Sequence, residues 1–127
     1  MEKRYVIDTS VWISYFDGSE KIVPVKEIIE SSEIVTSIIT VAELSDKFSR
    51  ENKNFNTVLT FLIAHSKIEG ISVSDATAAG ILKNKVRKNK KNFSLADALI
   101  YTLTKSKNTI LITADKEFEE LENVKIM

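Results

Sequence analysis

The clearest strand in the sequence is Thr109-Ile110-Leu111-Ile112-Thr113, which is apolar at its centre and rich in β-branched residues. A strand with apolar side chains on both faces is typical of a parallel sheet that helices cover on both sides. Residues 4–7 form a second buried-strand pattern, which ends at Asp8. The two segments together predict a parallel sheet at the centre of the fold.

Further strand and helix patterns alternate along the rest of the chain. Strands are expected at 33–36, 67–73 and 124–126. Helices are expected at 9–16 with Thr9 or Ser10 as the cap, around Pro24, at 39–50, at 55–65, from Ser74-Asp75, from Ser94 and after Asp115. This alternation predicts an α/β fold, a three-layer α/β/α sandwich with a central, mainly parallel sheet. The length of 127 residues favours a single domain over 1–127.

The composition is that of an ordinary soluble globular protein. Hydrophobic residues make up 43% and charged residues 28%, and no apolar run approaches the roughly 20 residues of a membrane-spanning helix. The first residues, Met1-Glu2-Lys3-Arg4, lead directly into a strand pattern and do not resemble a signal peptide. We therefore expect a cytoplasmic protein with no membrane partner.

The scarcity of nitrogen and sulfur ligands narrows the chemistry that the chain can perform. It has no cysteine, which excludes disulfides and thiolate chemistry, and its single histidine, His65, cannot build a zinc site alone. Carboxylates are therefore the groups left for metal or acid–base chemistry.

One basic segment, and not the net charge of the chain, indicates a possible nucleic-acid partner. Eighteen basic and 18 acidic side chains balance, so the whole chain carries no field that would attract nucleic acid. The densest basic run lies in residues 83–91 and consists of Lys83, Lys85, Arg87, Lys88, Lys90 and Lys91. Because it leads into the helix that bears Asp97, it is either a phosphate-binding surface near a site or simply a solvated helix end.

Four acidic residues stand at junctions between predicted strands and helices. Asp8 ends the first strand, Glu43 lies near the start of the helix after the second, Asp97 lies in the first turn of its helix, and Asp115 follows the last strong strand. All such junctions of a parallel sheet lie at one edge, where open α/β folds bind ligands. The topology therefore predicts that the four carboxylates form one cluster.

Each acid also has a simpler explanation as a helix cap. The spacings Thr40–Glu43 and Ser94–Asp97 match the capping box, and Asp8 and Asp115 can cap the helices that follow them. If the four acids instead lie close together, their carboxylates repel one another or bind a cation. An all-oxygen site suits Mg²⁺ or Mn²⁺, which can activate water and stabilise the displaced oxygen of a phosphodiester.

Four segments resemble, in chain order, the motifs of the PIN domain family, especially its VapC-type toxin ribonucleases. They are Val6-Ile7-Asp8-Thr9-Ser10-Val11-Trp12-Ile13, Val41-Ala42-Glu43-Leu44, Phe93-Ser94-Leu95-Ala96-Asp97-Ala98-Leu99-Ile100 and Leu111-Ile112-Thr113-Ala114-Asp115-Lys116-Glu117-Phe118. The resemblance spans nearly the whole chain and implies a Mg²⁺- or Mn²⁺-dependent endoribonuclease.

The resemblance also implies roles and partners. Asp8, Asp97 and Asp115 would hold the metal directly or through water, and Glu43 would complete the cluster or position the attacking water. Ser10 and Thr113 match supporting hydroxyl positions. The toxin branch further implies a type II toxin–antitoxin pair with a cognate antitoxin that blocks the site, a homodimer, and a tRNA or rRNA substrate.

Two other protein classes fit the sequence less well. A haloacid-dehalogenase-type phosphatase would need an aspartate at Ser10. A phospho-acceptor receiver domain would need paired acids where Asp8-Thr9 stands and a lysine where Thr113-Ala114-Asp115 stands. Two alternatives within the resemblance stay open: a PIN-like RNA-processing nuclease outside a toxin–antitoxin pair, and a PIN-like binding module without activity.

Overall fold

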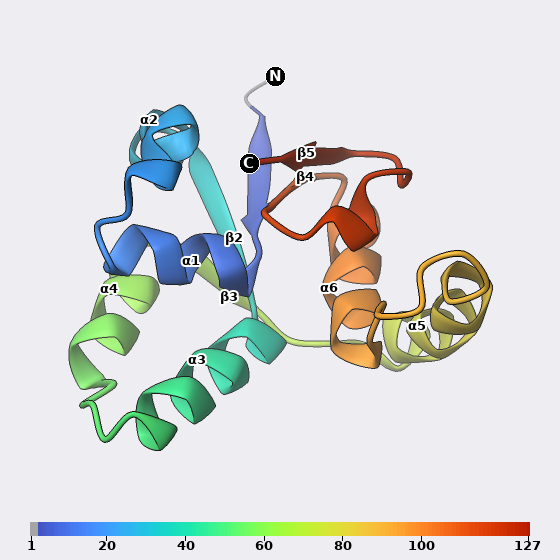
Figure 1. The fold of residues 1–127 in the computed structure, drawn as a ribbon, viewed down its shortest axis with the longest axis horizontal. Coiled ribbons are helices and arrows are strands. Elements are labelled where there is room, and N and C mark those ends of the chain that lie inside the picture. The colour runs from blue at the N-terminus through green and yellow to red at the C-terminus, as the bar shows by residue number, and fades with distance from the viewer. Residues whose placement is uncertain (1–2) are drawn as a thin grey trace.

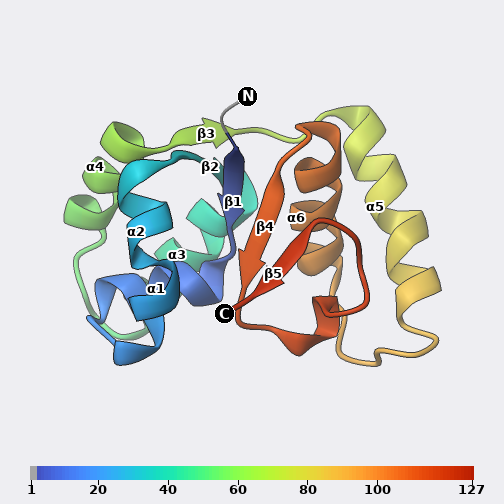
Figure 2. The ribbon, with the colours of Figure 1, turned by 90° about the horizontal axis from the view of Figure 1, so that it is seen from above.

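Five parallel strands form the centre of the molecule in the order β3-β2-β1-β4-β5 (Figure 1, Figure 2). The computed structural model describes residues 3–127. The strands are β1 (Arg4–Ile7), β2 (Glu33–Ser37), β3 (Lys67–Glu69), β4 (Ile110–Thr113) and β5 (Val124–Ile126). Since the strands are parallel, their carboxyl ends lie at the same edge of the sheet.

Helices cover both faces of this sheet. One face carries α1 (Thr9–Phe16), α2 (Val23–Ser31), α3 (Ile38–Arg50) and α4 (Asn56–His65), with the short 3-10 helix η1 (Glu20–Ile22) between α1 and α2. The other face carries α5 (Val73–Val86), α6 (Leu95–Ser106) and the 3-10 helix η2 (Lys116–Phe118). The predicted three-layer α/β/α sandwich with a parallel sheet is therefore confirmed.

The two cores show why the central strands are apolar throughout. Alternate residues of a strand point to opposite faces. On the α1–α4 side the buried strand residues are Ile7, Ile34 and Ile112. On the α5–α6 side they are Val6, Val35 and Leu111. A strand that contributes to both cores cannot carry a polar side on either face, which explains the continuous apolar pattern of β1 and β4.

Several predicted boundaries are wrong by a few residues. The third strand ends at Glu69 instead of Val73, because Ser72 caps α5 by accepting a hydrogen bond from the N–H of Asp75 (3.0 Å). This cap starts the helix earlier than Ser74-Asp75. Of the caps predicted for the first helix, Asp8 is confirmed and Thr9 or Ser10 is wrong, since the Asp8 carboxylate accepts from the N–H of Thr9. The short helix after Asp115 is a single 3-10 turn.

The α-helices have 8 to 14 residues each. Within residues 3–127, none has the length and apolarity needed to cross a membrane.

Candidate acidic site at the carboxyl edge of the sheet

Asp8 is the buried centre of a group of acidic side chains at the carboxyl edge. It follows β1 and is only 5% exposed. Its Oδ1 accepts a hydrogen bond from the N–H of Thr9 (2.8 Å), and its Oδ2 accepts one from the hydroxyl of Thr113 (2.6 Å), the last residue of β4. Because β1 and β4 are neighbours in the sheet, these two bonds fix the carboxylate between them.

Burial gives Asp8 an unusual affinity for a proton. Removal from water raises the pKa of its carboxyl from 3.8 to about 6. The hydrogen bonds from Thr113 and Thr9 oppose this rise, and the nearby charges of Asp97 and Glu43 add to it. A carboxylate in this position carries a negative charge that the surrounding protein does not fully compensate.

Glu43 is joined to Asp8 through Thr9. The Thr9 hydroxyl donates to Glu43 Oε1 (2.6 Å), while the N–H of the same residue donates to Asp8. The hydroxyl of Thr40 is hydrogen-bonded to that of Thr9 at 3.1 Å. Thr9 thus sets the separation between a carboxylate at the end of β1 and one on α3.

The capping explanation for Glu43 is wrong. Helix α3 begins at Ile38, and Ser37 caps it by accepting from the N–H of Ile39 (3.0 Å). Thr40 is therefore a fully buried residue in the first turn, and Glu43 lies in the second turn. At that depth the helical N–H groups already have carbonyl partners, so the Glu43 carboxylate has no capping role.

Asp115 is linked to Asp8 through Thr113. The N–H of Asp115 donates to Thr113 Oγ1 (3.0 Å), and that hydroxyl donates to Asp8. Ser10 lies beside this link: its Oγ is 3.4 Å from Asp8 Oδ2 and accepts from the N–H of Ala114 (3.3 Å). Asp115 also caps η2, since its Oδ1 accepts from the N–H of Glu117 (2.9 Å).

Asp97 joins the group through its charge. It forms the predicted capping box with Ser94: Asp97 Oδ2 accepts from the N–H of Ser94 (2.8 Å), and Ser94 Oγ accepts from the N–H of Asp97 (3.0 Å). Burial raises the pKa of Asp97, the bonds to Ser94 oppose the rise, and the charges of Asp115 and Glu117 add to it. Because the charge of Asp97 acts on Asp8 and the charge of Asp115 acts on Asp97, Asp97 lies within electrostatic range of both.

Glu117 is an acid of this edge that the sequence analysis did not assign to the site. Its Oε2 is buried and has no hydrogen-bond partner within residues 3–127. A buried carboxylate oxygen without a donor is costly, and a cation is one group that can compensate it. The signal in the sequence was its position two residues after Asp115, which places Glu117 in η2 and Asp115 at the N-cap of that turn.

Hydrogen bonding leaves part of each carboxylate free. The hydrogen bonds from the described residues use Oδ2 of Asp97, Oδ1 of Asp115 and Oε1 of Glu43. The second oxygen of each side chain accepts no hydrogen bond from the part of the chain that is described. Since a carboxylate oxygen has further lone pairs, a side chain can be held by a cap and still bind a cation.

The described residues contain no group of three or more acidic or histidine side chains already arranged to hold a metal ion. The chemistry of the donors nevertheless fits a hard divalent cation, because all are carboxylates. Two observations agree with such a cation: the raised pKa of buried Asp8 and the unpartnered oxygen of Glu117. Carboxylates that repel one another lie apart, and a cation would draw them together.

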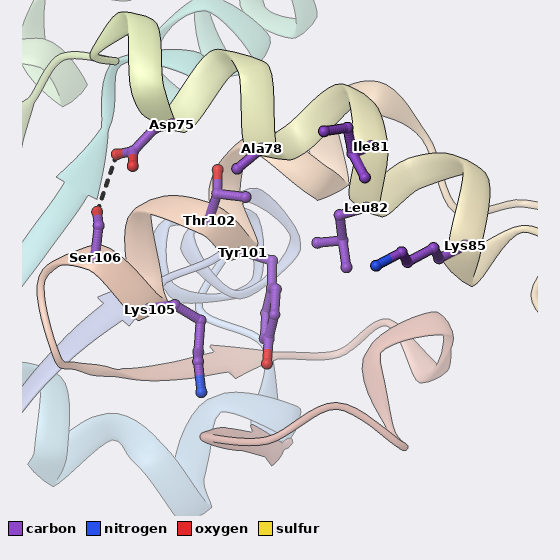
Figure 3. Close-up of a pocket in the computed structure, with 9 residues that line it drawn as sticks. All are labelled: Asp75, Ala78, Ile81, Leu82, Lys85, Tyr101, Thr102, Lys105 and Ser106. Carbon is purple, nitrogen blue, oxygen red and sulfur yellow. Dashed lines mark hydrogen bonds between the residues drawn. The ribbon is translucent and has the colours of Figure 1, made fainter.

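A separate groove of about 550 Å³ lies between α5 and α6 (Figure 3). Its lining is mostly apolar, with Ile81, Leu82 and Tyr101. The one acid among the described residues that line it is Asp75, whose carboxylate accepts from the hydroxyl of Ser106 (2.9 Å). None of the acids grouped around Asp8 lines it. The groove is thus distinct from the acidic site.

The chain matches a known protein family over most of its length. The family model described as PIN domain matches residues 5–124. A search of curated proteins yields no match.

Several solved structures share the fold. A chain of a toxin–antitoxin complex from Klebsiella pneumoniae is 22% identical with a TM-score of 0.75, and the match covers 95% of both chains. A chain of VapBC2 from Rickettsia felis, bound to a DNA fragment from their promoter, is 18% identical with a TM-score of 0.77, covering 98% of this chain and 97% of that one. VapC20 of Mycobacterium tuberculosis, a sarcin-ricin loop cleaving toxin, is 18% identical with a TM-score of 0.73, covering 96% and 98%.

Proposed function

The chain belongs to the PIN domain family, and we propose on this basis that it is a Mg²⁺- or Mn²⁺-dependent endoribonuclease, the toxin of a type II toxin–antitoxin pair. One observation carries the proposal: a continuous series of hydrogen bonds from Glu43 through Thr9, Asp8 and Thr113 to Asp115. A protein gains no stability from gathering like charges in this way. Such an arrangement is typical of a site that binds a cation.

The carboxylates divide into ligands and a positioning group. Asp8, Asp97 and Asp115 would hold the ion, directly or through water. When bound there, a divalent ion would supply a water of lowered pKa and a positive charge for the oxygen that leaves the phosphodiester. Glu43, held from one side by Thr9, has a free oxygen to orient the attacking water. Thr113, at the end of β4, and Ser10, in the first turn of α1, keep Asp8 in place.

The toxin assignment is supported by the proteins that share the fold. The Klebsiella and Rickettsia structures are toxin–antitoxin complexes, and VapC20 is a toxin that cleaves the sarcin-ricin loop. We propose by analogy that this chain binds a cognate antitoxin, forms a homodimer, acts in the cytoplasm and cleaves a tRNA or rRNA.

We expect the purified chain to cleave structured RNA with Mg²⁺ or Mn²⁺, and the variant Asp97→Asn to do so about 10²-fold more slowly, since one of three ligands is lost. The side-chain oxygen of asparagine can still accept from the N–H of Ser94, so the capping box and the fold should be retained. Asp75→Asn, in the separate groove, is the matched control and should retain full activity. The measurement is the initial rate of cleavage, with EDTA as the metal-free condition.

Cleavage that survives both EDTA and Asp97→Asn would contradict the assignment. The toxin role has its own readout, which is growth of cells that express the chain without an antitoxin. The wild type should stop growth and Asp97→Asn should not. Growth and RNA integrity that stay normal, together with cleavage in vitro, would favour an RNA-processing nuclease outside a toxin–antitoxin pair.

A further inference from the structure

The connector between α5 and α6, residues 87–94, is a short and well-anchored segment. The N–H of Lys90 donates to the carbonyl of Val86 (2.9 Å), and the N–H of Phe93 donates to the carbonyl of Lys90 (3.1 Å). Phe93 is fully buried and packs against Phe118 of η2, with 5.4 Å between ring centroids. The connector therefore has a fixed place against the fold.

That place is beside the acidic site. The connector ends at Ser94, whose backbone N–H holds the carboxylate of Asp97. Lys90 Nζ forms an ion pair with Glu119 Oε1 (3.0 Å), which ties the connector to the segment that follows Asp115. In Figure 2 the connector and η2 lie at the same edge as the carboxyl ends of β1 and β4.

Three cations of the connector point their charge towards solvent. Arg87, Lys88 and Lys91 are exposed, and none forms an ion pair within residues 3–127. Arg87 is oriented by a bond from its Nε to the carbonyl of Lys91 (3.1 Å), which leaves its terminal nitrogens available. Lys91 precedes Ser94 by only a few positions, so the two Cα atoms are at most about 10 Å apart.

The positive charge of these three residues can offset the repulsion that the acidic site exerts on a polyanion. A group of carboxylates repels a polyanion, and the whole chain has a formal charge of zero, so nothing global offsets the repulsion. Arg87, Lys88 and Lys91, which lie in the connector that leads to the helix of Asp97, offset this repulsion locally. The aromatic residue of the connector, Phe93, is fully buried against Phe118, so residues 87–94 expose no ring for stacking on bases and favour contacts with phosphates.

We propose that Arg87, Lys88 and Lys91, the connector cations, bind the phosphate backbone of an RNA strand and hold it next to the acidic site. This inference rests on the proposed ribonuclease function and adds the surface by which the substrate is bound. Arg87 can contact a phosphate through two N–H groups, and the two lysines bind as point charges. Lys90 has a different role, because Glu119 already neutralises it.

The test is the binding of a fluorescently labelled single-stranded RNA, measured by anisotropy in EDTA so that no cleavage intervenes. The variant Arg87→Ala/Lys88→Ala/Lys91→Ala is compared with wild type at salt concentrations between roughly 50 and 200 mM. We expect weaker binding and a plot of log affinity against log salt whose slope is smaller by about 2, from about 0.7 per lost contact for three cations.

Lys3→Ala/Lys21→Ala/Lys26→Ala is the matched control. It removes three exposed lysines outside the connector: Lys3 precedes β1, and the others lie in η1 and α2, over the opposite face of the sheet. This variant should keep the affinity and slope of the wild type. Charge reversal at single positions, Lys88→Glu and Lys91→Glu, gives a second measurement should the triple variant be poorly folded.

The outcomes separate this inference from the proposed function. Equal affinity and equal slope for the connector variants and the wild type would overturn the connector assignment, even if the wild type cleaves RNA. An equal loss in the control variant would overturn it as well, because binding would then follow total charge. If the wild type binds RNA through the connector but does not cleave it with Mg²⁺ or Mn²⁺, the connector assignment stands and the nuclease function fails.

Discussion

The variant Asp8→Asn should cleave RNA about 10³-fold more slowly than wild type, which corresponds to a loss of about 4 kcal/mol of transition-state stabilisation. This loss is larger than that expected for Asp97→Asn, because Asp8 stands at the centre of the hydrogen bonds that link Glu43 to Asp115. An amide in its place removes the negative charge that a divalent ion requires.

The fold should survive this substitution. The carbonyl oxygen of the new asparagine side chain can accept from the N–H of Thr9, and its amide can donate to the hydroxyl of Thr113, which also accepts from Asp115. Asp17→Asn, at the exposed end of α1, is the matched control for an aspartate-to-asparagine change and should cleave normally. Initial rates under substrate excess are the measurement, and an Asp8→Asn rate within tenfold of wild type would contradict the role of Asp8.

The same substitution should make the metal-free protein more stable at neutral pH. The pKa of the Asp8 carboxyl is 3.8 ordinarily and about 6 in the folded protein, mainly because of burial. Between these values the folded state binds more protons than the unfolded chain, so the free energy of unfolding falls as the pH rises through this window. The decrease from Asp8 alone amounts to roughly 3 kcal/mol, at 1.36 kcal/mol for each pH unit between the two pKa values.

Asp8→Asn removes this cost. The free energy of unfolding of the variant should match that of wild type near pH 4 and exceed it by up to roughly 3 kcal/mol at pH 7. Denaturant unfolding in EDTA at several pH values gives the free energy of unfolding of both proteins. Subtracting one from the other cancels the contributions of the other acids, such as Glu69, whose pKa is lowered. A difference that does not change with pH, or a wild type that is the more stable form at pH 7, would contradict the unfavourable burial of Asp8.

The main features of the fold could be predicted because apolar, β-branched segments can be buried on both faces only in a covered sheet. The grouping of Asp8, Asp97 and Asp115 at one edge then follows from parallel topology. The capping box of Ser94 and Asp97 was also readable, because it depends on residues three positions apart. Local spacing is sufficient for such features.

Features that depend on tertiary contacts could not be predicted. Ser37 and Thr40 are equally good caps by composition, and the choice is made by the pairing of Ser37 with Glu69 in β3, which continues β2 to that point. The link from Thr9 to Glu43 joins residues 34 positions apart. The ion pair of Lys90 with Glu119, which removes one cation from the basic run, joins residues 29 positions apart.

The buried oxygen of Glu117 is another feature that depends on tertiary contacts and could not be predicted. Its position after Asp115 was visible, but its buried oxygen results from the packing of η2, whose Phe118 is fully enclosed.

A crystal structure of the chain grown with Mn²⁺ tests the central claim most directly, because anomalous scattering locates the ion without reference to activity. We predict a Mn²⁺ peak in contact with Asp8, Asp97 and Asp115 in the wild type, with the carboxylates drawn together, and no peak there in Asp8→Asn. Saturating Mn²⁺ that leaves this edge of the sheet empty in the wild type, or that binds there equally well in Asp8→Asn, would contradict the account.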